Sequence, residues 1–166
     1  MVAERTTRLE DAVRATGDLK LIAYIMAGHP SKKRSIDVGK RLAASGIAAL
    51  EIGIPHSDPL ADGPVIQRAG HEALRAGMTV AAAIEVAAAV AADGIPVVLM
   101  SYINPILQHD ARKFAAEAAQ AGVAGVIVPD LPIEEAEPVT AWFRAASLDT
   151  IFMVAPTTPP ERIASI

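Results

Sequence analysis

The chain has 166 residues, 52% of them hydrophobic, and a formal net charge of -4 at pH 7. That length allows one domain with a hydrophobic core, and the lack of a basic surplus argues against a nucleic-acid partner. There is no cysteine, which excludes disulfides and thiolate metal sites. A small soluble protein is the expectation from composition.

The amino-terminal segment MVAERTTRLEDAVRATGD is charged and contains no apolar core of a signal peptide. The alanine-rich stretch 81–92 is too short and too weakly apolar to span a bilayer. We therefore expect a cytoplasmic protein that has no association with a membrane.

Short runs of branched apolar residues alternate with helical stretches along the chain. The runs, most of which end in Gly, Pro or Asp, predict strands over 20–28, 48–55, 96–102, 125–130 and 150–156. The stretches between them predict helices over 31–45, in two segments within 66–93, over 110–121 and over 133–146.

Three of the predicted helices stop at a glycine directly before the next strand, at Gly46, Gly94 and Gly122. A helix carboxyl end favours a residue that tolerates positive φ, so these glycines support the helix boundaries. Strand, helix and strand in series imply parallel pairing with right-handed crossovers. Because no linker or composition shift divides the chain, residues 1–166 are predicted to form a single α/β domain.

The stretch LEIGIPHSDPLADGP, residues 50–64, places a carboxylate inside a predicted strand. Strand alternation puts Glu51 on one face between the small residues Ala49 and Gly53, and the large apolar residues on the other. One interpretation of Glu51 is a buried carboxylate satisfied by hydrogen bonds for structure. The other is a general acid/base whose pKa is raised by apolar surroundings.

Asp62 and its neighbours also allow more than one interpretation. Asp before Gly is ordinary turn chemistry, so Asp62 can be a simple turn former. A metal site built from Glu51, His56, Asp58 and Asp62 is a weaker alternative, because no second histidine stands at ligand spacing, and no metal is expected.

Five collinear segments of the sequence resemble one known family. LEIGIPHSDPLADGP looks like the signature of the tryptophan synthase alpha chain, and IAYIMAGHP, PVVLMSYINPIL, GVIVPDLPIEEA and IFMVAPTTPPERI are similar to successive segments of that family. The resemblance implies a TIM (β/α)₈ barrel that cleaves indole-3-glycerol phosphate to indole and glyceraldehyde 3-phosphate. It also implies a beta subunit partner in an alpha2-beta2 heterotetramer, which holds the pyridoxal phosphate, so that this chain has no cofactor of its own.

The resemblance further implies roles for individual residues. Glu51 and Asp62 match the catalytic glutamate and aspartate of the family. The residues implied to line the indole pocket are Tyr24, Met100, Tyr102, Ile127 and Met153. Those implied to contact the beta subunit are Pro55, Asp58, Pro59, Asn104, Asp130, Pro132 and Glu134. For any one pocket residue, simple core packing is an equal alternative, and Asp130 also fits a turn former.

Two features depart from the family. His56 stands where the family usually has Phe or Tyr, which adds a titrating group beside the site. A complete (β/α)₈ barrel needs about 250 residues, and this sequence ends after its fifth predicted strand. We therefore expect a partial barrel without the last three strand-helix units. No glycine-rich phosphate loop is evident either, which predicts little indole formation by residues 1–166 alone.

Three functions remain open from the sequence. The first is a lyase subunit that uses Glu51 and Asp62. The second is a non-catalytic partial barrel that docks a beta subunit. The third, a different phosphate-using barrel aldolase, is weak because no lysine lies within the predicted strand cores beyond Lys20 at a strand start, so a Schiff base has no candidate nucleophile.

Overall fold

The computed structural model describes residues 8–15 and 19–166. The other residues, 1–7 and 16–18, belong to the amino-terminal segment in which we expect no signal peptide. That expectation therefore lies partly outside the described residues. One parallel sheet runs in chain order, β1-β2-β3-β4-β5. Its strands are β1 (Ile22–Met26), β2 (Ala49–Gly53), β3 (Val97–Met100), β4 (Gly125–Ile127) and β5 (Asp149–Ile151). The predicted parallel α/β architecture is confirmed.

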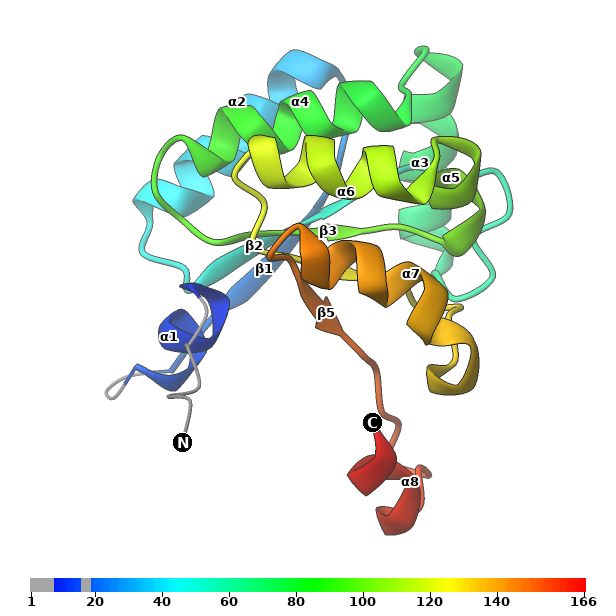
Figure 1. Cartoon of the computed structure of the whole chain (residues 1–166). Coiled ribbons are helices and arrows are strands. Elements are labelled where there is room, and N and C mark those ends of the chain that lie inside the picture. The colour runs from blue at the N-terminus through cyan, green and yellow to red at the C-terminus, as the bar shows by residue number, and fades with distance from the viewer. Residues whose placement is uncertain (1–7, 16–18) are drawn as a thin grey trace.

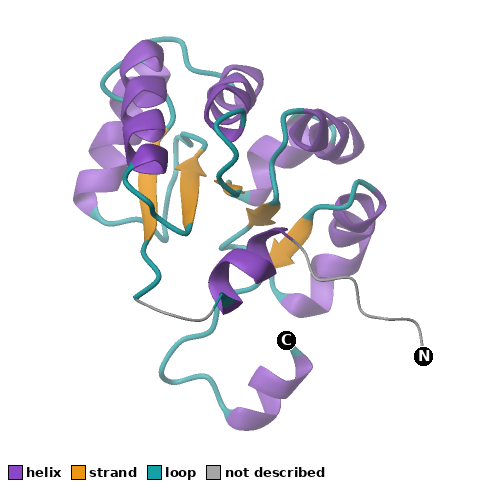
Figure 2. Ribbon diagram, turned by 90° about the vertical axis from the view of Figure 1, so that its left-hand side faces the viewer, coloured by secondary structure: helices purple, strands orange, loops and turns teal. Residues whose placement is uncertain are grey.

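The sheet is an arc, with most helices on its outer side, one on its inner side by the amino-terminal ends of the strands, and the last helix apart from the sheet (Figures 1 and 2). The helices are α1 (Arg8–Arg14), α2 (Lys32–Ala44), α3 (Pro64–Arg75), α4 (Val80–Ala91), α5 (Ile103–Gln108), α6 (Ala111–Gln120), α7 (Ile133–Ala145) and α8 (Pro160–Ser165). Helix α1 is the one on the inner side, and it was not predicted; neither was the short helix α5.

Local sequence explains where the longer helices begin and end. The side-chain oxygens of Ser31, Thr79 and Asp110 accept backbone N–H groups at the starts of α2, α4 and α6. The φ angles are +83°, +88° and +76° at the predicted stop residues Gly46, Gly94 and Gly122. The expectation that these glycines end helices is therefore confirmed.

The hydrophobic core lies between the outer face of the sheet and the helices. Leu50 and Ile52 of β2 are fully buried there, together with Val86 and Val90 of α4. Helices α2 and α4 approach closely at Gly39, where an added Cβ would lie 2.7 Å from a methyl group of Val90. This layer fixes β2, and with it the residue that points to the opposite face.

The fifth strand is shorter than the predicted range 150–156, and the predicted carboxyl end was wrong. Hydrogen-bonded pairing with β4 stops at Ile151, and the run continues as a loop in which Met153 is 63% exposed. The reason lies in β4, which ends at Ile127 just before Pro129, a residue that has no N–H for a sheet ladder. An apolar run without a partner strand cannot stay in the sheet.

Within the part of the chain that the structure describes, no single helix is long and apolar enough to cross a membrane. Helices α3 and α4 reach the required length and composition only when taken together, and they are bent by 108° relative to each other.

Candidate active site

Glu51 lies on the inner, concave face of the sheet, opposite the large apolar residues of β2, as strand alternation predicts. Its neighbours along the strand, Leu50 and Ile52, are fully buried on the outer face, whereas Glu51 is half-buried. Burial raises the pKa of the Glu51 carboxyl above its ordinary value. The uncharged acid therefore persists to higher pH than in water, which suits a group that must both donate and accept a proton.

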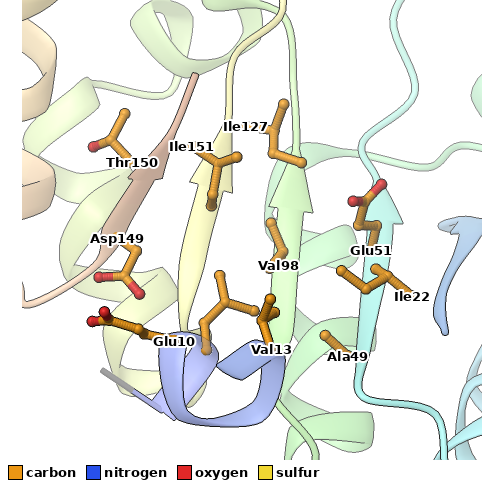
Figure 3. A pocket seen from close by; sticks show the side chains of 11 residues that line it. Glu10, Val13, Ile22, Ala49, Glu51, Val98, Ile127, Asp149, Thr150 and Ile151 are labelled. Carbon is orange, nitrogen blue, oxygen red and sulfur yellow. The ribbon is translucent and has the colours of Figure 1, made fainter. Parts of the chain in front are cut away.

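The inner face lines an open cavity of about 440 Å³, and Glu51 is one of its wall residues (Figure 3). Most of the other sheet residues around it are apolar, among them Ile22, Val98, Ile127 and Ile151. Helix α1 lines the same cavity with Leu9, Glu10 and Val13. The sequence feature that could have predicted α1 is the spacing of Leu9 and Val13, four residues apart on one helix face. Glu10, Glu51 and Asp149 all line this cavity, and most of its other lining residues are apolar. Such a cavity can hold an apolar group beside a proton donor.

Asp62 lies on the loop between β2 and α3, at the carboxyl end of the strands. Its backbone N–H donates to Pro59 O at 3.1 Å, and its carbonyl accepts from Gln67 Nε2 at 2.9 Å. The side chain is half-buried, and this burial raises the pKa of the Asp62 carboxyl. The bonds that fix the backbone leave the carboxylate free to accept a hydrogen bond from a ligand.

Tyr24 lies near both carboxylates. It pairs with Glu51 across β1 and β2. Burial, followed by the negative charges of Asp62 and Glu51, raises the pKa of the Tyr24 hydroxyl. The ring lies against Gly53, where an added Cβ would be only 2.0 Å from the hydroxyl oxygen, so this packing requires glycine. Glu51 and Asp62 are therefore both close enough to the Tyr24 hydroxyl to raise its pKa.

The other predicted pocket residues are placed differently from one another. Ile127 lines the cavity with Glu51, and Met100 is half-buried at the end of β3. Tyr102 is 6% exposed, and its hydroxyl accepts the backbone N–H of Ala61 at 2.8 Å. Met153 instead lines a separate hollow with Val128 and Phe152. Their roles toward a substrate remain predictions.

The residues predicted to contact a beta subunit lie at the carboxyl-end rim of the sheet. Pro55 and Pro59 are buried, and five are exposed: Asp58, Asn104, Asp130, Pro132 and Glu134. Adjacent loops are joined, because Asp130 Oδ1 accepts the N–H of Ile103 at 2.9 Å. Glu134 already has a partner in this chain, since Arg162 donates to both of its carboxylate oxygens, at 2.5 and 3.2 Å.

The described residues contain no group of three or more His, Asp or Glu side chains arranged to hold a metal ion. His56, whose packing the sequence left open, stacks against Tyr102 with a ring-centroid distance of 5.1 Å. The two rings are tilted by 33° relative to each other. The site therefore consists of carboxylates, tyrosines and apolar walls.

Comparison with known proteins points to one family. The family model described as "Tryptophan synthase alpha chain" matches residues 11–166. The alpha chain of Prochlorococcus marinus is 46% identical over 155 residues, which cover 93% of this chain and 56% of that protein. The alpha chain of Carboxydothermus hydrogenoformans is 47% identical over 154 residues, which cover 92% of this chain and 58% of the relative.

Solved structures agree with these relatives. Tryptophan synthase from M. tuberculosis superposes with a TM-score of 0.92 at 38% identity, covering 97% of this chain and 66% of that one. Tryptophan synthase subunit alpha from Legionella pneumophila gives a TM-score of 0.90 at 36% identity, covering 97% and 63%. The chain thus spans a little over half the length of the two curated relatives named above.

Proposed function

Because this chain belongs to the tryptophan synthase alpha chain family, we propose that it is a lyase that cleaves indole-3-glycerol phosphate to indole and glyceraldehyde 3-phosphate. The observation that carries the proposal is the position of Glu51. Its carboxyl group lies in an apolar cavity on the concave face, with a raised pKa, and Asp62 lies on the next loop.

The reaction needs two proton transfers and one bond cleavage. Glu51, in its acid form, donates a proton to indole C3, and the positive charge spreads to the ring nitrogen. The Glu51 carboxylate then takes the proton of the glycerol hydroxyl nearest the ring. The bond between C3 and the glycerol carbon breaks, its electrons return to the ring, and the hydroxyl oxygen becomes the aldehyde carbonyl. The net change moves one proton from oxygen to C3.

Asp62 has the complementary role in this proposal. Its carboxylate accepts a hydrogen bond from the indole N–H and stabilises the positive charge as it develops, which lowers the transition state relative to the bound substrate. Glu51 and Asp62 are on separate elements, a strand and a loop, which permits one to titrate and the other to remain charged. The residues proposed to surround the indole are Tyr24, Met100, Tyr102, Ile127 and Met153, although Met153 lines a hollow separate from the Glu51 cavity.

We also propose that the exposed rim residues Asp58, Asn104, Asp130, Pro132 and Glu134 dock a beta subunit, with Pro55 and Pro59 keeping their loop rigid. Pyridoxal phosphate belongs to that partner in this proposal, and the location of both is the cytoplasm. The support is that these residues share one edge of the sheet and that two of their loops are hydrogen-bonded to each other.

The test is indole formation from indole-3-glycerol phosphate by two proteins. One is the chain of residues 1–166, and the other joins it to the carboxyl-terminal part of the Carboxydothermus hydrogenoformans relative that it does not match. We expect the joined protein to form indole far faster, because strands supplied by the relative complete the barrel and the phosphate site. Equal inactivity of the joined protein and its Glu51→Gln variant would contradict the proposed function.

A further inference from the structure

The loop between β2 and α3, residues 54–63, has to hold Asp62 in place although much of it is exposed. Leu60 in this loop is 93% exposed. Internal bonds shape the loop, from Asp62 N to Pro59 O at 3.1 Å and from Leu60 N to Asp58 O at 3.0 Å. Such bonds fix the curvature of a loop. At its start the loop is attached to β3, because Ile54 N–H donates to Met100 O at 2.8 Å, but this bond lies eight residues before Asp62.

Several side-chain bonds attach the loop to its surroundings. Gln67 Nε2 donates to Asp62 O at 2.9 Å, and His71 Nε2 lies 3.1 Å from Ser57 O. Both side chains are on α3, the helix that directly continues the loop. They would move together with the loop if the loop and the start of α3 shifted as one body.

Tyr102 makes a different attachment. Its hydroxyl oxygen accepts the N–H of Ala61 at 2.8 Å, from a position 41 residues away in the sequence. Tyr102 stands at the end of β3, where it is the cap residue before α5. It is 6% exposed and packs against the ring of His56. Among the side-chain hydrogen bonds of the described residues, this is the one that joins the loop to an element outside β2 and α3.

The bond lies next to the carboxylate that the proposed reaction needs. Ala61 directly precedes Asp62, and the backbone of Asp62 is close enough to the Tyr102 hydroxyl to influence its pKa. Burial, the largest cause, raises that pKa above its ordinary value. The hydroxyl oxygen accepts the Ala61 N–H at 2.8 Å.

We propose that Tyr102 is a positioning residue that holds Asp62 in its working place by anchoring the adjacent Ala61 N–H to the end of β3. This inference rests on the proposed function for its catalytic consequence, but the anchor itself is a property of the fold. A carboxylate that must meet an indole N–H loses much of its effect if it is displaced by about 1 Å.

The test uses Tyr102→Phe, which removes the hydroxyl and keeps the ring against His56. Amide hydrogen exchange of Ala61, measured by NMR on the 166-residue chain, should accelerate about threefold to tenfold, the range for loss of one hydrogen bond. Ser45→Ala is the matched control. Its hydroxyl also makes one hydrogen bond to the backbone, but as the donor to Leu42 O at 2.7 Å, at the end of α2. Its loss should therefore leave Ala61 exchange unchanged.

In the joined protein, we expect Tyr102→Phe to lower turnover about tenfold with little change in KM. Because the effect acts through Asp62, the double variant with Asp62→Asn should be no slower than Asp62→Asn alone. Unchanged Ala61 exchange in Tyr102→Phe, or losses that multiply in the double variant, would overturn the proposal. Hydrogen exchange needs no substrate. Absence of indole formation would therefore count only against the proposed function, and the NMR measurement would still test the hydrogen bond between Tyr102 and Ala61.

Discussion

The two faces of strand β2 have opposite characters. Leu50 and Ile52 point outward, are fully buried and join the core under α2 and α4. Glu51, between them, points inward to a cavity and keeps part of its surface exposed. Because side chains alternate along a strand, one short segment contributes stability with one face and chemistry with the other. Substitutions on the two faces are therefore expected to affect different measurements.

The largest expected effect is on the inner face. In the joined protein, Glu51→Gln should lower turnover by about a thousandfold or more while KM changes little, because both proton transfers use this group. Steady-state indole formation measures the effect. Near wild-type turnover in this variant would show that Glu51 is not the general acid/base.

The outer face gives the next effect. Ile52→Ala should lower the free energy of unfolding by about 3 kcal/mol, since it leaves a cavity in a fully buried layer. Urea denaturation of the chain measures this loss. Turnover per folded molecule of the joined protein should stay close to wild type, and a large loss of turnover at full folding would break the separation of the two faces.

The loop that follows β2 supplies the third effect. Asp62→Asn should lower turnover on the order of a hundredfold, with KM largely kept, because the amide cannot stabilise a positive charge as a carboxylate does. The same indole assay applies. A rise in KM with turnover unchanged would mean that Asp62 serves binding rather than the transition state.

The smallest effect concerns the cost of Glu51 to stability. The pKa of the Glu51 carboxyl in the folded protein is raised above the usual 4.5. Below about pH 4 the carboxyl is protonated in both the folded and the unfolded protein, so its contribution to the free energy of unfolding does not change with pH. As pH rises through the folded pKa, ionisation disfavours the folded state. Wild type should therefore lose stability relative to Glu51→Gln between pH 4 and pH 7, measured as the difference in Tm. A difference that shrinks or stays constant with rising pH would contradict the raised pKa.

Much of the fold follows from the sequence because its signals are local. The apolar runs and the glycines at 46, 94 and 122 predict the strand and helix order, and alternation predicts the face of Glu51. The predicted end of β5 was wrong because the length of a strand depends on the strand that pairs with it, and β4 ends before Pro129. Helix α5 was missed because Pro105 reads as a loop, although proline is tolerated in the first turn of a helix.

The site was less accessible from the sequence alone. Glu51 and Asp62 were found through resemblance and the oddity of a carboxylate in an apolar strand. The contact between Tyr102 and Ala61 joins residues far apart in the chain and involves a backbone N–H, so no residue pattern encodes it. The part of α1 in the cavity was also missed, because its seven residues carry only a short apolar spacing.

The central claim is that Glu51 on the concave face transfers the proton at indole C3. It is tested most directly by incubating indole and glyceraldehyde 3-phosphate with the joined protein in D₂O and following the C3 proton signal by NMR. We expect the wild-type protein to replace the C3 hydrogen with deuterium and Glu51→Gln to show no exchange above the rate without protein. Exchange by Glu51→Gln at the wild-type rate would show that another group carries this proton.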